Sequence, residues 1–248
     1  MKNLWYPTVL IPAAGKGQRF KDAGFRVIKP LIPIRDPYDH VFKGKRPMVE
    51  HAMHGTKGWS KIIGMPADSL GESYLYKNNT DRDNDPLIVV PVEPNGGQLD
   101  TIEALLDCVI VQDAPVLILN SDVSFRNGIL QAFCYICFHY PVDAGAIVVK
   151  RGVEQVNSYS FVDDLPAFRR GVEREWLSRW ALAGAYWFRN VSTLRRAMGE
   201  GRASHHDGER YISSIFEGMD NLAFPIADEN YWEFGTPEKL AAFVEEHK

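Results

Sequence analysis

The sequence predicts an α/β protein in which helices cover both faces of a mostly parallel central sheet, giving three layers. Two observations lead to this fold class. Apolar, β-branched runs of strand length alternate with helix-like segments over the first 150 residues. After about residue 150 the alternation loosens into shorter runs, which predicts a small antiparallel portion. The 248 residues, 45% hydrophobic and 24% charged, are typical of a soluble globular protein.

The first part of the chain is expected to alternate five strands with four helices. The expected strands are Thr8–Pro12, Lys61–Met65, Leu87–Pro91, Val116–Asn120 and Gly145–Val149. The expected helices are Pro47–Lys57, Ala67–Lys77, Leu99–Val111 and Gly128–Tyr140, and the segments 35–46 and 78–86 are expected to be polar loops. Strands in this arrangement pair in parallel, and a ligand cleft then lies at their carboxyl ends.

The second part of the chain is expected to form the other wall of that cleft. Strands are predicted at Tyr159–Val162 and Ala181–Phe188, and helices at Ser192–Met198, Gly208–Glu217 and Pro237–His247. No linker, repeat or low-complexity tract separates the two parts. The sequence therefore predicts a single domain over residues 1–248, with one half at about 1–150 and the other at about 151–248.

Composition argues against several classes of protein. The net charge is −4, from 28 Lys and Arg against 32 Asp and Glu, so there is no basic excess for nucleic acid. No membrane span is expected, because the sequence has no run of about 18 apolar residues, and the N-terminal segment has no apolar signal region. Three cysteines do not make a disulfide framework, so we expect a cytoplasmic protein. Of the three cysteines, Cys134 and Cys137 lie in an apolar helical run and are expected to be buried core thiols.

The most informative segment is the loop that follows the first predicted strand. Gly15 and Gly17 are two residues apart, Arg19 follows, and Lys29 comes ten residues later before Pro-Leu. Small residues let backbone N–H groups approach an anion, and the two cations suit a polyphosphate. The spacing is neither that of a Walker loop nor that of a dinucleotide fingerprint. The sequence thus predicts a phosphate cradle, with an ordinary strand-to-helix turn as the alternative.

Gly-x-Gly-x-Arg followed by Lys-Pro-Leu resembles the signature of the sugar-phosphate nucleotidyltransferases, the pyrophosphorylases that make nucleotide-activated sugars. The resemblance extends in order from about Val9 to Phe243. Within it, Glu209-Arg210-Tyr211-Ile212-Ser213 resembles a run found in the short nucleotidyltransferases of surface-polysaccharide pathways. The family resemblance implies a GT-A-like, Rossmann-like fold, Mg²⁺ as cofactor, and two substrates: a nucleoside triphosphate in the first half of the chain and a phosphorylated small-molecule acceptor in the second.

The same resemblance implies roles for the loop residues. Arg19 would hold the triphosphate and stabilise the departing pyrophosphate, and Lys29 would bridge the α-phosphate and the incoming phosphate. These two are the expected catalytic residues. The nucleotide would contact a second set, made of small residues in the loop and two polar residues at the glycine turn that opens a later helix: Ala13, Ala14, Gly15, Gly17, Gln98 and Thr101. For the turn before Gln98, a plain loop-to-helix transition is the alternative.

Two acids are candidates for the metal. Asp122 follows an apolar strand, where a carboxylate faces the cleft and suits a hard cation, although a helix-capping or loop aspartate is the alternative. The resemblance implies that Asp122 and Glu233 bind Mg²⁺. Glu233 stands two residues before Gly235-Thr236-Pro237, where aspartate is frequent in the family. Thr236 is also expected to cap the last helix, which Pro237 begins.

Three residues in the second half are candidates for binding the acceptor. Glu173 and Arg174 resemble the family's Glu-Lys segment, whose lysine meets the phosphate of the sugar phosphate; arginine replaces it here, and a solvated charged strand is the alternative. Gly184 belongs to a run that resembles the family's Gly-x-Tyr-x-Phe strand, where glycine lets a sugar ring approach the backbone.

The expected reaction is attack of a phosphate oxygen of the acceptor on the α-phosphorus of a nucleoside triphosphate, which releases pyrophosphate and forms a nucleotide sugar. Three alternatives stay open at this point. The acceptor could be a non-sugar phosphate, such as a phosphorylated amino alcohol or amino acid amide. A GT-A glycosyltransferase would need a second acid where Ser124 stands. A non-catalytic nucleotide sensor is the third. The sequence specifies neither the base nor the acceptor, and it allows a homo-oligomer.

Overall fold

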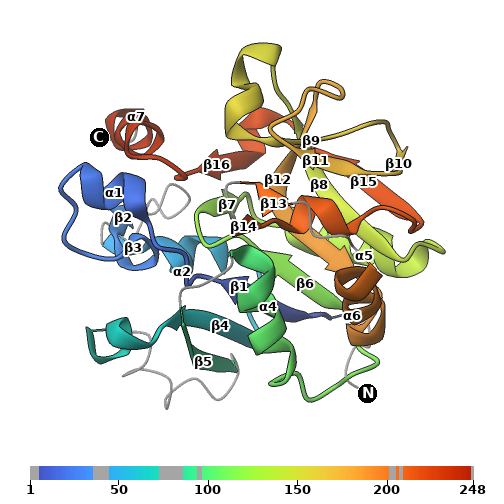
Figure 1. Cartoon of the computed structure of the whole chain (residues 1–248), viewed down its shortest axis with the longest axis horizontal. Helices are drawn as coiled ribbons and strands as arrows, with labels where there is room; N and C mark the ends of the chain where they lie inside the picture. The colour runs from blue at the N-terminus through green and yellow to red at the C-terminus, as the bar shows by residue number, and fades with distance from the viewer. Residues whose placement is uncertain are drawn as a thin grey trace.

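The fold is that of an α/β protein built on one large sheet (Figure 1). The computed structural model describes residues 6–35, 45–72, 86–93, 97–200, 205–206 and 209–246. Within them the sheet has ten strands, and its main path runs β10-β15-β8-β12-β6-β1-β4-β5; β9 pairs with β12, and β11 pairs with β9. These strands are β1 Thr8–Pro12, β4 Lys61–Pro66, β5 Leu87–Val92, β6 Val116–Leu119, β8 Ala144–Lys150, β9 Ser160–Val162, β10 Ala167–Phe168, β11 Gly171–Glu173, β12 Trp180–Phe188 and β15 Asn221–Pro225.

The central strands pair as the alternating pattern predicts. β5, β4, β1 and β6 are parallel neighbours, and β15 pairs in parallel with β8. β12 runs antiparallel between β6 and β8, so strands from both parts of the chain share one sheet. The mostly parallel sheet with a small antiparallel portion is therefore confirmed.

Helices cover the two faces of this sheet. α2 Met48–Ala52 and α5 Ile129–His139 lie on one face, and α4 Gln98–Leu106 and α6 Val191–Glu200 lie on the other. Two further helices, α1 Gln18–Asp22 and α7 Pro237–Glu246, belong to a separate core. In β1, Val9 and Ile11 point into the core beneath α2 and α5, whereas Leu10 points into the core beneath α4 and α6. Burial on both faces explains why the strands read as continuous apolar runs rather than alternating ones.

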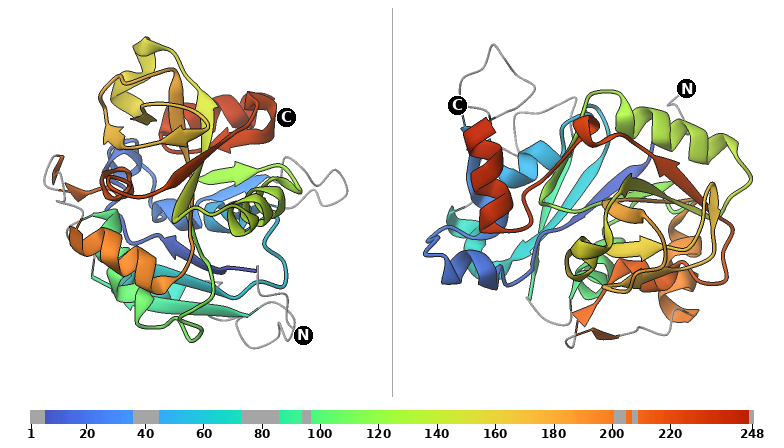
Figure 2. Two further views of the ribbon diagram at one scale, coloured as in Figure 1. Left: turned by 90° about the vertical axis from the view of Figure 1, so that its right-hand side faces the viewer. Right: turned by 90° about the horizontal axis from the view of Figure 1, so that it is seen from above.

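A third, smaller hydrophobic core brings together α1, near the start of the described chain, and α7, at its end. Phe20 of α1 packs with Phe234 and with Leu240 and Phe243 of α7. The rings of Phe234 and Phe243 meet edge to face with centroids 4.9 Å apart. Figure 2 shows α7 beside α1, at the edge of the central sheet. The loop that follows β1 is therefore braced by the last helix.

Short elements complete the fold. Three two-stranded ribbons pair β2 Pro33–Arg35 with β3 Lys45–Pro47, β7 Val123–Phe125 with β16 Tyr231–Glu233, and β13 His205–His206 with β14 Glu209–Arg210. The 3-10 turns are Lys29–Leu31, Ala67–Glu72, Val153–Ser158, Ile212–Ile215 and Asp228–Asn230. No helix among the described residues is long and apolar enough to span a bilayer.

Several predicted helices differ from the structure. The predicted helix Leu99–Val111 ends at Leu106, because the β-branched run Val109–Val111 disfavours helix and the chain turns there instead. The predicted helix Pro47–Lys57 is reduced to α2. Of the predicted helix Ala67–Lys77, a 3-10 turn forms to Glu72 and the remainder lies outside the described residues. Most of the predicted loops, 36–44 and 78–85, also lie outside them.

One predicted helix is wrong. In place of a helix over Gly208–Glu217, Glu209–Arg210 form strand β14 and Ile212–Ile215 form a 3-10 turn. Arg210 makes a parallel bridge with Gly97, and its guanidinium lies 2.8 Å from the Asp100 carboxylate. These contacts with α4 hold the segment extended, so tertiary contacts override the local apolar pattern.

The predicted burial of Cys134 and Cys137 is confirmed. Both lie on α5 with no exposed surface, packed in the core beneath that helix. Burial raises the pKa of both thiols well above the usual range.

We expect truncation of a buried side chain at the centre of the parallel sheet to lower the free energy of unfolding strongly. Leu117 is fully buried in β6, so Leu117→Ala should lower the free energy of unfolding by about 2–5 kcal/mol. Urea denaturation measures the change. Ile110→Ala, at a position 87% exposed, is the control and should change it by less than about 0.5 kcal/mol. A small effect at Leu117 would contradict a tightly packed centre.

Candidate active site

A cleft of about 530 Å³ opens at the carboxyl ends of β1 and β6. It contains almost every residue that the sequence singled out: Ala13, Gly15, Gly17, Arg19, Lys29, Gln98, Thr101, Asp122, Glu173, Arg174, Gly184 and Glu233 all line it. The exception is the Ala14 side chain, which packs in the core beneath α4. The cleft therefore lies where parallel α/β sheets place their ligands.

The glycine loop forms one side of the cleft. Ala13 continues the sheet, because its N–H donates to the Gly64 carbonyl at 2.9 Å. Beyond it, within the described part of the chain, no protein group accepts a hydrogen bond from the backbone N–H of Gly15, Lys16 or Gly17. Lys16 and Arg19 are exposed at this edge of the cleft. Free N–H groups beside two cations are suited to a polyanion.

The two predicted metal ligands converge because two short strands pair. Asp122 immediately precedes β7, and Glu233 is the last residue of β16. The antiparallel register sets Glu233 opposite Val123, and the Phe234 N–H donates to the Asp122 carbonyl at 2.8 Å. Residues more than one hundred positions apart thus meet at one edge of the cleft.

Gly235 leaves space between these two carboxylates. A Cβ at position 235 would lie 2.9 Å from Glu233 Oε1 and 3.3 Å from Asp122 Oδ2. Any side chain there would enter the gap that both oxygens face. Two carboxylate oxygens around an open gap fit a hard divalent cation such as Mg²⁺. Among the described residues no group of three or more His, Cys, Asp or Glu could hold a metal, so phosphate oxygens and water would supply the other ligands.

Each of these carboxylates is paired with a lysine. Lys29 Nζ lies 2.6 Å from Asp122 Oδ2 and 3.4 Å from the Gly235 carbonyl oxygen. Lys239 Nζ lies 2.7 Å from Glu233 Oε1. The four side chains are between 16% and 29% exposed, so water screens both ion pairs only partly.

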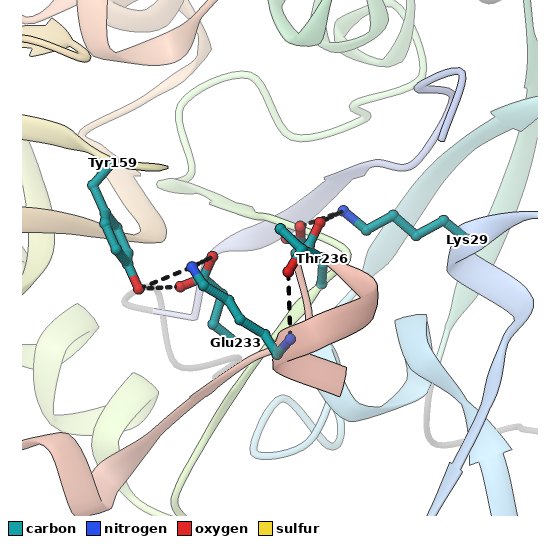
Figure 3. A network of polar contacts seen from close by, with 7 residues as sticks. Lys29, Tyr159, Glu233 and Thr236 are labelled. Atoms are coloured by element: carbon teal, nitrogen blue, oxygen red, sulfur yellow. Dashed lines mark hydrogen bonds and ion pairs between the residues drawn. The ribbon is translucent and has the colours of Figure 1, made fainter. Parts of the chain in front are cut away.

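Glu233 is held by a second partner, Tyr159 (Figure 3). The Tyr159 hydroxyl donates to Glu233 Oε2 and accepts a hydrogen bond from Lys239 Nζ at 3.2 Å. Burial, and next the negative charge of Glu233, raise the pKa of Tyr159, so the phenol stays protonated and donates. Burial is the largest single effect on the pKa of Lys239 and lowers it, but the charges and hydrogen bonds of Glu233 and Tyr159 together outweigh burial, and the net pKa is raised.

Thr236 and Pro237 act as the sequence predicts. Pro237 begins α7, and Thr236 Oγ1 accepts a hydrogen bond from the Lys239 N–H at 3.3 Å. This cap fixes the first turn of α7, which carries Lys239. The capped turn thereby places a cation beside Glu233.

Gly184 lies on the opposite wall, at an irregularity of β12. The pairing of β12 with β8 shifts register between Leu182 and Tyr186, and Gly184 has a φ of +83°. A Cβ there would come within 2.9 Å of the Asn120 side chain. The Gly184 carbonyl accepts a hydrogen bond from the Asn120 N–H at 2.8 Å. Only glycine fits a left-handed backbone packed this closely.

Arg174 and Glu173 lie beside one another on the same wall. Arg174 Nε is 3.7 Å from Glu173 Oε1, and Ser160 donates a hydrogen bond to Glu173 Oε2. Arg174 has a φ of +53°, the one left-handed non-glycine residue in the described chain. Its N–H donates to the Tyr159 carbonyl at 3.1 Å. A non-glycine residue held in this conformation beside a cleft is typical of functional sites.

The start of α4 forms the remaining side. Gln98 Nε2 donates a hydrogen bond to Asn120 Oδ1, and Thr101 Oγ1 donates to the Gly97 carbonyl at 3.4 Å. Both residues line the cleft between the glycine loop and β12. Their amide and hydroxyl groups suit hydrogen bonding to a base or ribose.

Sequence reasoning missed several polar residues of the cleft, among them Lys16, Asn120, Tyr159 and Lys239. Asn120 ends an apolar strand two residues before Asp122, so the rule that ligands lie at strand ends could have found it. Lys16 lies inside the glycine loop itself. Tyr159 and Lys239 carry no local signal, because each depends on a contact with Glu233.

Comparison with known structures identifies the fold class. The nucleoside-diphosphate-sugar pyrophosphorylase of Vibrio cholerae RC9 superimposes with a TM-score of 0.75 at 17% identity, covering 96% of this chain and 99% of that one. The UTP-bound UGPase of Acinetobacter baumannii gives 0.73 at 15% identity, covering 97% and 92%. The inositol-1-phosphate CTP transferase of T. maritima gives 0.69 at 17%, covering 96% and 93%.

The chain therefore has the sugar-phosphate nucleotidyltransferase fold, and the fold that its motifs imply is confirmed. No protein-family model and no curated protein sequence matches the chain. At 15–17% sequence identity these structural matches establish the fold of the chain, and the fold alone does not define the reaction.

The gap at Gly235 generates a prediction. Gly235→Ala should place a methyl group between Glu233 and Asp122 and weaken Mg²⁺ binding by about 10–100-fold, the scale of disturbing the surroundings of a metal ligand. Isothermal titration calorimetry with MgCl₂ measures the affinity. Gly199→Ala, at a position where a Cβ meets nothing within 4 Å, is the control. Unchanged Mg²⁺ affinity in Gly235→Ala would mean that the ion does not bind between Glu233 and Asp122.

Proposed function

We propose that this protein is a nucleotidyltransferase that transfers a nucleoside monophosphate from a nucleoside triphosphate to a sugar phosphate, releasing pyrophosphate and forming a nucleotide sugar. One observation carries the proposal: the glycine loop, the Lys29–Asp122 pair and Glu233 all line one cleft of the nucleotidyltransferase fold. The solved structures of this fold include proteins named for such reactions.

The proposed mechanism rests on positioning and charge neutralisation. The free N–H groups of the glycine loop and the Arg19 guanidinium hold the triphosphate. Lys29 leaves Asp122 and contacts the α-phosphate and the incoming phosphate, where negative charge increases as the new bond forms. Arg19 stabilises the pyrophosphate as it departs. Asp122 and Glu233 would hold Mg²⁺, which would neutralise phosphate charge when bound.

The acceptor lies against the opposite wall in this proposal. Arg174 can grip a phosphate with two hydrogen bonds, and Glu173 can accept hydrogen bonds from sugar hydroxyls. Gly184, which has no side chain, would let a sugar ring approach the backbone of β12. On the resemblance to short nucleotidyltransferases, we place the activity in the cytoplasm, where it would supply nucleotide sugars for surface polysaccharides.

A non-sugar phosphate acceptor is a second candidate. Arg174 replaces the lysine of the sugar-phosphate motif, and one solved structure of this fold is named as an inositol-1-phosphate CTP transferase. A glycosyltransferase role fits the site less well. Ser124, at the place of the second acid of Asp-x-Asp, is fully buried and 3.3 Å from the His51 carbonyl oxygen, to which it donates.

The direct test is pyrophosphate release. The protein would be incubated with Mg²⁺, each of the four common nucleoside triphosphates, and a panel of sugar, polyol and amino alcohol phosphates. Mass spectrometry of the product would identify base and acceptor together. Binding of a triphosphate without pyrophosphate release from any acceptor would favour the sensor alternative.

The Lys29 role generates a prediction. Lys29→Ala should lower kcat by about two to four orders of magnitude, the scale of losing one preorganised charge that stabilises the transition state. Steady-state pyrophosphate release measures it. Lys57→Ala, at an exposed lysine after α2, is the matched control and should retain wild-type turnover. Near-normal turnover in Lys29→Ala would remove Lys29 from the mechanism.

Arg174 generates a separate prediction about the acceptor. Arg174→Ala should raise the acceptor KM about ten- to hundredfold and leave the triphosphate KM nearly unchanged, since a charge-assisted bidentate contact is worth about 1.5–3 kcal/mol. Arg174→Lys should recover part of the loss. Arg196→Ala, on the exposed side of α6, is the control. Equal losses for both substrates would contradict an acceptor contact.

A further inference from the structure

Lys239 is the cation of the cleft that no sequence motif accounts for. It lies in the first turn of α7, and its ammonium has three neighbours: Glu233 Oε1 at 2.7 Å, the Tyr159 hydroxyl at 3.2 Å, and the face of the Tyr159 ring at 4.4 Å from the centroid. The side chain is 29% exposed. The ammonium is therefore held at one place beside the second acid.

The oxygen that Lys239 contacts is also the oxygen that faces the gap at Gly235. Glu233 Oε1 lies 2.9 Å from the Cβ position of Gly235, and Asp122 Oδ2 lies 3.3 Å from it. Oε2, by contrast, is engaged by Tyr159. Both gap-facing oxygens thus carry a lysine ammonium, one from Lys29 and one from Lys239.

This pairing leaves the cluster electrically neutral. Two carboxylates are balanced by two ammonium groups, so a divalent ion in the gap would meet two positive charges at close range. The ion can bind Glu233 well only if the Lys239 ammonium withdraws from Oε1. Lys239 has space to do so, because it also borders a neighbouring cleft of about 250 Å³, lined with Arg151, Trp232 and Phe243.

We propose that Lys239 is a built-in competitor of the divalent cation at Glu233. Its ammonium occupies the carboxylate when no ion is bound and moves away when the ion binds, so Lys239 sets the metal affinity of the site. Tyr159 keeps Oε2 fixed throughout, and the carboxylate stays directed at the gap. The inference rests on the proposed role of Asp122 and Glu233 as metal ligands, but it requires no turnover.

The test measures metal binding directly. Free Mn²⁺ would be followed by electron paramagnetic resonance during titration of the full chain without nucleotide. Asp122→Asn identifies the relevant ion as the one it loses. Lys239→Met keeps the length of the side chain and removes its charge, and it should bind that Mn²⁺ about tenfold more tightly or better, where tenfold corresponds to about 1.4 kcal/mol.

Three matched variants sharpen the result. Lys239→Arg keeps the charge and should bind Mn²⁺ like the wild type. Lys57→Met removes an exposed charge outside the cleft and should also match the wild type. In a Glu233→Gln background the effect of Lys239→Met should shrink to a small part of its size, because the competition acts through Glu233.

The outcomes separate this inference from the proposed function. Unchanged Mn²⁺ affinity in Lys239→Met would overturn the competition and leave the metal site intact. Weaker binding in Lys239→Met, with a wild-type melting temperature, would overturn it too, since Lys239 would then only orient Glu233. If Asp122→Asn removes no Mn²⁺, both the metal assignment and the competition are wrong. Lost pyrophosphate release with tighter Mn²⁺ binding would leave the competition standing.

Discussion

The pairing of β7 with β16 is the constraint on which the cleft depends. Each of these strands has only three residues, yet they fix Asp122 and Glu233 at one edge through the Phe234–Asp122 backbone hydrogen bond. Asp122 is also tied to the central sheet, because it follows β6 directly. Glu233 is tied to the core that Phe20, Phe234 and Phe243 form between α1 and α7. The glycine loop and the second acid are therefore held by the same small group of aromatic side chains.

Charge is arranged in this cleft as matched pairs. Lys29 faces Asp122, Lys239 faces Glu233, and Arg174 lies beside Glu173. Lys16 and Arg19, at the exposed edge, form no close ion pair of this kind in the described part of the chain, although Glu238 is near enough to Arg19 to interact with its charge. A polyanion that enters the cleft would therefore contact the two exposed cations first, and then cations that must leave a carboxylate. This order lets a protein with a net charge of −4 hold a phosphate site without a basic surface.

The fold could be predicted largely from local pattern. Strands such as β1 and β6 are buried on both faces, so each is a continuous apolar run that is easily recognised in the sequence. The glycine loop and Asp122 come directly after these two strands, where ligands bind in parallel sheets, so their place in the cleft could be predicted too. The pairing of β7 with β16 could not be predicted, because three-residue strands carry no periodicity. The helix predicted over Gly208–Glu217 failed for a related reason: Arg210 binds Asp100 across the fold. The roles of Tyr159 and Lys239 could not be predicted either, because both residues act through contacts with Glu233.

The three cysteine thiols differ in how accessible they are to chemical reagents. Cys134 and Cys137 are sealed in the core, whereas Cys108 is half-buried just beyond the end of α4. A maleimide dye or nitroxide would therefore attach selectively at Cys108 in the native chain, without removal of the other cysteines. The same helix begins at Gln98 in the cleft. A single label on the otherwise unmodified protein would thus show, from the far end of the helix, whether α4 moves when a substrate binds.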